Sequence, residues 1–288
     1  MKSLNSFSKI FLILILSTVA FLSLTAYAAK QAYSADPDFL KKVEEKYHWK
    51  IHLNNNGFLA EESSGPKELT HDSWNFTPPK NNLSIKILSG DIALKTTTAK
   101  EIKISAEGLL NSKVAPRLLK TEITEFQLAI SQPENGTENL RVQIEIPTSF
   151  TKNLSVITAS GDITAESLSL NSVELKTVSG AITLNKVTIK DLALKTVSGN
   201  FQARESSIAD LSGKSVSGDI EVYDLIPANV DFASVSGNIK LKIIPNEKTN
   251  FSLNSVSGDI FNKHEHQLSN NYDLQVKAST MSGNIQIE

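Results

Sequence analysis

A six-residue signature recurs seven times in the C-terminal half of this chain. Each copy reads Thr or Ser, a mostly apolar residue, Ser-Gly, then Asp, Asn or Ala, and finally Ile or Phe. The first four intervals between copies are 19 residues each. A fixed period of this length is typical of stacked-repeat proteins, in which each unit buries its apolar face against the next. The glycines of the seven copies are Gly161, Gly180, Gly199, Gly218, Gly237, Gly258 and Gly283.

Apolar positions alternate with polar ones on both sides of each glycine. Because residues i and i+2 share a face only in a strand, this pattern predicts β-strands with one buried side. A 19-residue unit is much shorter than the about 40 residues of a propeller blade. The sequence therefore predicts an all-β, single-stranded β-solenoid whose rungs stack about 4.8 Å apart. Its inward spine is expected to be Ile163, Ile182, Phe201, Ile220, Ile239, Ile260 and Ile285.

The Ser-Gly step is expected to form a corner of each rung, because glycine takes positive φ without steric cost. An earlier copy, Leu88 to Ile92, adds Gly90 to these corner glycines. Polar residues eight positions before the glycines predict a second corner. Hydroxyl residues three positions before the glycines fall on inward positions, and we expect them to hydrogen-bond along the stack. They are Thr158, Thr177, Thr196, Ser215, Ser234, Ser255 and Thr280.

The chain divides into four predicted segments. A signal peptide (1–28) precedes a non-repeating region (29–81) with a short helix or loop and a linker; an irregular β-segment (82–150) then caps the regular rungs (151–288). The chain stops at Glu288, just after a predicted strand. Unless the surface loop around Asn262 to Tyr272 folds over it, we expect the strand within 274–288 to be an open edge that is free to pair with another chain.

The N-terminus has the layout of a secretory signal. Lys2 and Lys9 are followed by an apolar run from Ile10 to Leu24 and by Ala26-Tyr27-Ala28, a small-x-small cleavage site. The apolar run is shorter than the about 20 residues of a membrane-spanning helix, so we expect no transmembrane span after cleavage. An uncleaved anchor is the alternative. We predict an exported bacterial protein, either periplasmic or released to the cell surface or medium.

Charge and cysteine usage narrow the class of partner. Cleavage would remove two lysines, leaving 27 basic against 31 acidic residues and a formal charge of −4. This balance does not favour nucleic-acid binding. The chain contains no cysteine, so it has neither disulfides nor a lipid-attachment thiol, as expected of a soluble exported protein.

Three lysines are the strongest candidate contact residues. Lys176, Lys195 and Lys214 each lie four residues before a corner glycine, so they are expected to stack as a basic stripe on the outer face. Such a stripe could contact an acidic glycan or lipid headgroup. Solvated lysines also guard β-surfaces against aggregation, and we favour that interpretation.

Other polar clusters are assigned structural roles. The Asp and Asn residues after the glycines form a column that Ala181 interrupts, and turn chemistry explains them better than cation binding. His264 and His266 are too few for a zinc site. Glu205, Glu221 and Asp224 are scattered among turns, whereas glycoside hydrolysis needs two carboxylates about 5 to 10 Å apart in a cleft. We therefore expect no catalytic residue, metal or cofactor.

The strand Leu140 to Pro147, followed by Leu154-Ser155-Val156 and the repeated Ser-Gly-Asp/Asn-Ile units, resembles the bacterial family called putative adhesins, a domain of unknown function. The resemblance covers residues 82–288. It implies an exported single-chain β-solenoid and supplies no binding residues. We expect a non-enzymatic interaction or adhesin-like scaffold whose partner is an envelope protein or glycan. Two alternatives stay open, a polysaccharide-acting β-helix enzyme and a self-assembling subunit.

Overall fold

The computed structural model describes residues 49–54, 57–62, 67–133, 136–225, 229–243, 249–264 and 274–288. Every regular element in these ranges is a strand, and none of the described residues forms an apolar helix able to cross a membrane. The predicted signal peptide and the helix near Pro37 lie outside these ranges. The chain separates into two compact units, Met1–Gly65 and Pro66–Glu288.

The described part of the first unit is one hairpin. Strands β1 (Trp49–Asn54) and β2 (Gly57–Glu62) pair antiparallel, with Trp49 opposite Glu62.

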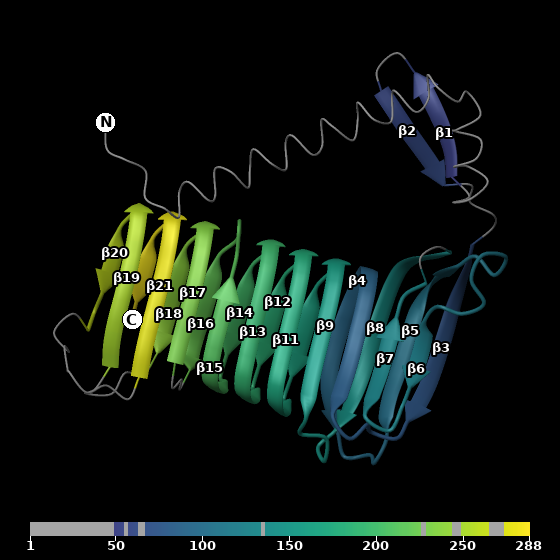
Figure 1. Ribbon diagram of the computed structural model, residues 1–288, viewed down its shortest axis with the longest axis horizontal. Helices are drawn as coiled ribbons and strands as arrows, with labels where there is room; N and C mark the ends of the chain where they lie inside the picture. Colours follow the sequence, from purple (N-terminus) through teal and green to yellow (C-terminus); the bar gives the residue numbers. More distant parts are fainter. Residues whose placement is uncertain are drawn as a thin grey trace. The chain divides into compact units, whose positions relative to one another are not determined.

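The second unit is the β-solenoid that the 19-residue period predicts (Figure 1). Each regular rung places one strand before its corner glycine and one after it, and the two sets form two parallel sheets, here called the pre-glycine sheet and the post-glycine sheet. The pre-glycine strands are β9 (Asn153–Ser160), β11 (Ser169–Ser179), β13 (Thr188–Ser198), β15 (Ser207–Lys214), β17 (Asn229–Ser236), β19 (Thr249–Ser257) and β21 (Leu274–Ser282). The post-glycine strands are β10 (Ile163–Glu166), β12 (Ile182–Asn185), β14 (Phe201–Arg204), β16 (Ile220–Leu225), β18 (Ile239–Ile243), β20 (Ile260–Asn262) and β22 (Ile285–Ile287).

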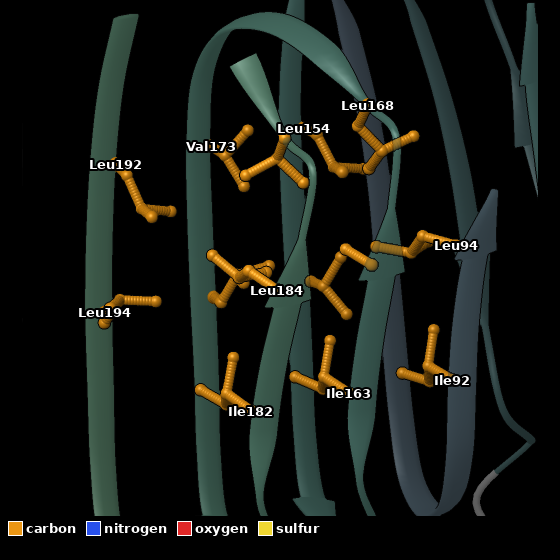
Figure 2. Packing of buried hydrophobic residues seen from close by; sticks show 14 of the residues in the cluster. Ile92, Leu94, Leu154, Ile163, Leu168, Val173, Ile182, Leu184, Leu192 and Leu194 are labelled. Carbon is orange, nitrogen blue, oxygen red and sulfur yellow. The ribbon is translucent and has the colours of Figure 1, made fainter. Parts of the chain in front are cut away.

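Apolar side chains of successive rungs lie above one another inside the stack. Ile92, Ile163 and Ile182 form one such column, and Leu154, Val173 and Leu192 form a second column at another level of the interior (Figure 2). All six side chains are at most 2% exposed. Residues 19 apart pair in strict parallel register, so the predicted inward spine is confirmed along the interior of the stack.

The corner glycines stack directly on one another. At Gly180, φ is +151°, and an added Cβ would lie 2.1 Å from the carbonyl oxygen of Gly161 in the preceding rung. No Cβ fits at this distance, which explains why the signature retains glycine. A further corner follows each of the post-glycine strands β10, β12 and β14, and its residue takes φ between 48° and 58° without being glycine: Ser167, Lys186 and Glu205. The equivalent Asp224 also has positive φ, but it lies within β16, where the register with β18 shifts.

The inward hydroxyl residues do not form the continuous hydrogen-bonded ladder that the sequence suggested. Thr158 donates to the Ser160 carbonyl at 3.3 Å, and Thr280 donates to the Gly237 carbonyl at 3.3 Å. The hydroxyl oxygens in the middle of the column are buried and have no hydrogen-bond partner: Thr177, Thr196, Ser215 and Ser234. The expectation of hydrogen bonds along the stack was therefore wrong for these four residues. At the tail it holds, because Thr280 bonds to the Gly237 carbonyl and Ser255 bonds to the Gly283 carbonyl at 3.0 Å, each in the adjoining rung.

At the head of the stack, β4 (Asn82–Thr97) forms a first regular rung that pairs with β9 and β10. Residues 98–152, between β4 and β9, build a cap on the other side of β4. The cap strands are β5 (Ile102–Leu110), β6 (Lys120–Ile123), β7 (Gln127–Ser131) and β8 (Thr137–Pro147). Strands β7 and β8 run parallel to β4, whereas β5 and β6 run antiparallel to their neighbours β8 and β7.

Strand β3 (Glu68–Phe76) also belongs to this unit, because it pairs antiparallel with β5 along its whole length. Residues from 67 onward, which the sequence pattern grouped with the non-repeating region 29–81, are therefore part of the solenoid unit. Their alternation was too weakly apolar to show this, since β3 carries three apolar residues in nine.

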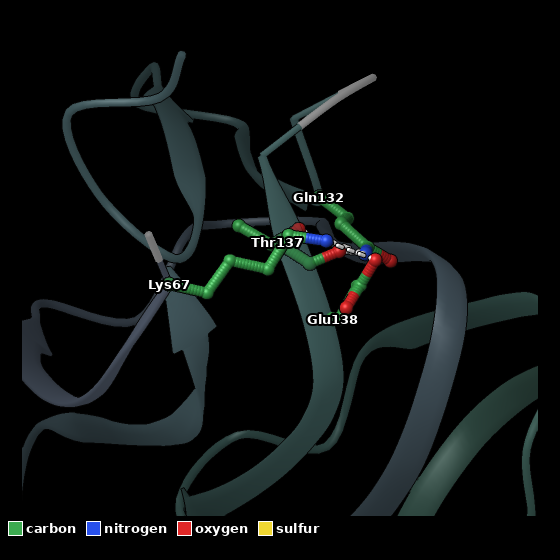
Figure 3. Close-up of polar contacts among 4 residues, drawn as sticks. All are labelled: Lys67, Gln132, Thr137 and Glu138. Atoms are coloured by element: carbon green, nitrogen blue, oxygen red, sulfur yellow. Dashed lines mark hydrogen bonds and ion pairs between the residues drawn. The ribbon is translucent and has the colours of Figure 1, made fainter. Parts of the chain in front are cut away.

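Gln132 closes the head of the stack where no earlier rung exists. Its Oε1 accepts hydrogen bonds from the backbone nitrogens of Leu88 and Ser89 at 2.8 and 2.9 Å. Its Nε2 donates to the hydroxyl of Thr137 at 2.9 Å, beside an ion pair between Lys67 and Glu138 (Figure 3). The Gln132 side chain thus accepts backbone N–H groups of β4, which in the other rungs bond to the backbone of a neighbouring rung.

The order of the last two rungs differs from their order in the sequence. Strand β21 pairs with β17 on one side and with β19 on the other, and β22 lies likewise between β18 and β20 (Figure 1). The expectation that the strand within 274–288 is the open edge was therefore wrong. The C-terminal rung is internal, and β19 with β20 forms the tail end of the stack.

Candidate functional site

The outer face of the pre-glycine sheet presents its side chains in columns across the rungs. Lys176, Lys195 and Lys214 are neighbours in register on β11, β13 and β15, as the spacing predicts. Lys195 and Lys214 are exposed, whereas Lys176 is half-buried and pairs with Glu174 at 2.5 Å. The stripe therefore offers two exposed ammonium groups and one already engaged within the sheet.

Beside the lysine stripe, a groove of about 560 Å³ crosses the same face. It forms where the column six residues before the glycines narrows to the small side chains Ala193 and Ser212. Five successive strands contribute to it, from β11 to β21. Its polar lining is Ser172, Asp191, Asp210, Ser212, Asn229, Asp231, Gln275 and Lys277.

The groove has an acidic and amide-bearing wall. Asp191 and Asp210 are neighbours in register, and the Asp210 carboxylate accepts a hydrogen bond from the Asn229 amide at 2.6 Å. Lys190 lies 3.9 Å from Asp191 at the exposed margin. Four residues of strand, about 13 Å, separate this wall from the lysine stripe. The face thus carries parallel acidic and basic columns.

The column of Asp and Asn residues after the corner glycines acts as a backbone staple. The Asp162 carboxylate accepts the Ala181 backbone N–H at 2.7 Å, and the Asp219 carboxylate accepts that of Asn238 at 2.8 Å. Asn200 and Asn238 accept from the next rungs in the same way. The side-chain oxygens are used within the stack, and the described residues contain no group of three acidic or histidine side chains placed to hold a metal.

The carboxylates considered for glycoside hydrolysis have separate partners. Glu221 accepts hydrogen bonds from Gln202 at 3.1 Å and from the Tyr223 hydroxyl at 3.2 Å. Asp224 lies 3.1 Å from Lys242, and Glu205 lies 3.8 Å from Lys186. Each carboxylate is thus paired with or hydrogen-bonded to its own neighbour.

The post-glycine sheet also holds an ion pair that changes the pKa of a lysine. The Glu288 carboxylate, 3.1 Å from the Lys240 ammonium, raises the pKa of Lys240 through a hydrogen bond. This contact links β18 to the end of the chain.

Of the histidine cluster, His264 is described and His266 lies outside the described residues. The His264 ring stacks on Phe251 with centroids 6.3 Å apart, which is a packing contact.

A smaller hollow of about 350 Å³ lies at the head of the post-glycine sheet. His71, Glu107 and Arg141 stand in one row across β3, β5 and β8, with His71 Nδ1 3.9 Å from Glu107. The sequence could not reveal this hollow, because its residues come from antiparallel strands outside the repeat.

Comparison with known proteins identifies one family. Residues 76–288 match the family model described as Toastrack DUF4097, whereas no curated protein matches the chain.

Solved structures that match this chain include three of low identity. A putative cell adhesion protein from Clostridium sporogenes is 10% identical, with 77% of this chain and 99% of that chain covered and a TM-score of 0.36. A putative adhesin from Bacteroides fragilis is 14% identical over 77% and 98% of the two chains, with a TM-score of 0.43. A putative lipid binding protein from Parabacteroides distasonis is 14% identical over 76% and 96%, with a TM-score of 0.42.

Proposed function

Because the chain belongs to the Toastrack DUF4097 family, we propose that it is an exported, non-enzymatic scaffold of the bacterial cell envelope. The outer face of the pre-glycine sheet binds an extended partner, an envelope glycan or protein segment. Support for export comes from the N-terminal sequence, with its basic start, apolar run and Ala26-Tyr27-Ala28 site.

The observation that carries this proposal is the direction of the groove. Its lining comes from five successive rungs, so it runs along the stack axis and spans about 19 Å at the usual strand spacing. Equivalent groups recur at each step, as in the neighbouring pair Asp191 and Asp210. A linear polymer with regularly spaced polar groups fits such a surface, whereas a reaction centre needs different groups converging on one point.

The polar groups that line the groove indicate which chemical groups the partner should carry. Carboxylate and amide oxygens accept hydrogen bonds from hydroxyl, amine or amide donors, and the small floor at Ala193 and Ser212 lets a chain approach the backbone closely. The ammonium groups of the exposed Lys195 and Lys214 can form charge-assisted hydrogen bonds with anionic substituents on the same polymer.

The experiment that tests this proposal uses substitutions that fill the groove and leave the hydrophobic core unchanged. A protein carrying Ala193→Arg and Ser212→Arg places two long side chains on the groove floor, while Thr164→Arg with Thr183→Arg adds the same charge to neighbouring rungs of the opposite sheet. Binding to purified cell-wall glycan and to isolated envelope proteins is measured by pull-down and titration. We expect at least a tenfold loss for the groove variant and no change for the control.

Equal binding by both variants would contradict the proposal. Release of new reducing ends from the glycan by the unmodified protein would contradict the non-enzymatic assignment and favour the polysaccharide-acting alternative. Replacing Lys176, Lys195 and Lys214 together by Glu separates the contribution of the lysine stripe from that of the groove.

A further inference from the structure

The tail end of the stack is a rung with a neighbour on one side. In the described part of the chain, residues 250–257 of β19 pair with β21, and β20 pairs with β22. These residues are called the terminal edge below. We propose that two copies of this chain associate tail to tail through the terminal edge, each rung completing the other's sheets.

The inward-facing apolar residues of the terminal edge are less buried than their equivalents in the other rungs. Ile260 is 43% exposed, whereas its equivalents Ile239 and Ile285 in the adjoining rungs are fully buried. Phe251 and Leu253, which continue the pre-glycine core, are also only partly buried. The terminal rung therefore presents the open end of the hydrophobic interior, and contact with another rung would remove this apolar surface from water.

The outward positions of the terminal rung are also unusual. Phe261 is 58% exposed and occupies the position three residues after the corner glycine, where the regular rungs carry polar residues. These are Thr164, Thr183, Gln202, Glu221, Lys240 and Gln286. Val256 is 73% exposed, more than any of its equivalents Val178, Val197 and Val216. Both features favour burial in an interface over exposure to solvent.

Charge distinguishes the two ends of the stack. No charged residue occurs between Asn250 and Ser257, although charged residues are the usual protection of an open sheet edge. At the head, by contrast, β3 carries Glu68, His71 and Asp72, and the short β6 carries Lys120 and Glu122. The head edge is protected against pairing and the tail edge is not, which favours tail-to-tail association over head-to-tail growth.

The terminal edge is self-complementary. A two-fold axis perpendicular to the stack pairs equivalent strands antiparallel, which gives a closed, isologous interface. The three residues of β20 are flanked by Asp259 and Lys263. Antiparallel pairing centred on Phe261 therefore places Asp259 opposite Lys263 of the second copy, twice across the axis. An opposite-charge pair of this kind stabilises a cross-strand contact.

The first experiment measures the oligomeric state of the full mature chain by sedimentation velocity across a hundredfold concentration range. We expect a monomer–dimer equilibrium. Val256→Lys on the terminal edge should weaken dimerisation at least tenfold, and Val197→Lys, at the equivalent position of an internal rung, should leave it unchanged. A monomer at every concentration, equal effects of the two variants, or species that grow beyond the dimer would overturn the proposal.

A charge exchange tests the pairing itself. Asp259→Lys alone places like charges opposite one another and should weaken the dimer at least tenfold. Adding Lys263→Asp in the same chain restores the opposite-charge pair and should recover most of the affinity. Failure of the double variant to recover dimerisation, with circular dichroism showing an intact β-fold, would contradict the antiparallel register.

Discussion

At the residue scale, neighbouring rungs compensate for each other's side-chain volumes. The inward position five residues before the corner glycine holds Leu194 in one rung, Gly213 in the next and Phe232 in the one after. A Cβ added at Gly213 would lie 2.4 Å from the Phe232 ring. The ring therefore fills the space that the glycine leaves, and it also packs against Phe201 at a centroid distance of 6.1 Å.

This compensation predicts strong coupling between the two positions. Gly213→Leu alone should destabilise the fold by about 1–3 kcal/mol, because the added side chain displaces the Phe232 ring. Phe232→Leu alone should also destabilise it, because it leaves a void beside the glycine. The double variant restores a leucine column and should recover most of the loss. Urea unfolding of the four proteins measures the coupling, and additive effects would contradict the packing described.

The hydroxyl column shows where residue-level prediction fell short. Periodicity placed Thr177 and Ser215 on the inward side, and both are buried. It could not give their hydrogen bonds, since those depend on the spacing between rungs and on which carbonyl oxygens the corner exposes.

At the element scale, the staples formed by Asp and Asn residues connect the corners of successive rungs. Each side-chain oxygen accepts the backbone N–H of the equivalent residue in the next rung, as Asp91 does for Asp162 at 3.0 Å. Ala181 is the exception, because it has no side-chain oxygen to offer Asn200. The connection is therefore missing between β12 and β14.

Supplying the missing staple should stabilise the protein. We expect Ala181→Asn to raise the free energy of unfolding by about 0.5–1.5 kcal/mol, the usual net gain for one hydrogen bond. Asp162→Ala, which removes the acceptor of the preceding rung, should lower it by a similar amount. Thermal and urea unfolding compare the two variants with the parent protein. A loss of stability in Ala181→Asn would show that the corner has no room for the amide.

Glycine marked its corners correctly, although Gly199 and Gly237 stand there without the positive φ that was expected. The corners after β10, β12 and β14 were not predicted. Gly161 and Gly218 stand at corners with positive φ, as their sequence position predicts. Lys186 and Glu205 also take left-handed conformations, but neither residue type signals this, because stacking against the next rung imposes the geometry. The groove was missed for a related reason, since it arises from two small side chains, Ala193 and Ser212, whose positions carry no distinctive pattern.

At the scale of the whole unit, the repeat predicted the architecture but not the order of its rungs. Every regular rung offers the same apolar columns and the same corner, so each could stack on any other. The last two intervals lengthen to 21 and 25 residues, and the connection between β18 and β19 spans five residues, about 17 Å when extended. This length suffices to pass one rung at 4.8 Å spacing. Local periodicity contains no information on which rung is the neighbour.

The antiparallel pairing of strands in the cap could not be predicted from the sequence either. The sequence analysis treated residues 82–150 as one irregular β-segment, and the structure divides it into the strands β4 to β8. Alternation is the same in both strand directions, however, so it could not show that β5 runs against β8 or that β3 joins the edge.

The order of the terminal rungs decides which edge is exposed, and engineered disulfides measure it most directly in a chain that has no cysteine of its own. Lys277 is the register neighbour of both Asp231 and Ser252. Under oxidation, D231C/K277C and S252C/K277C should each crosslink, because neighbouring strands hold the two Cα atoms within disulfide range. D231C/S252C, two rungs apart, should not crosslink. Efficient crosslinking of D231C/S252C, with none in D231C/K277C, would show that the rungs stack in sequence order and would contradict the account.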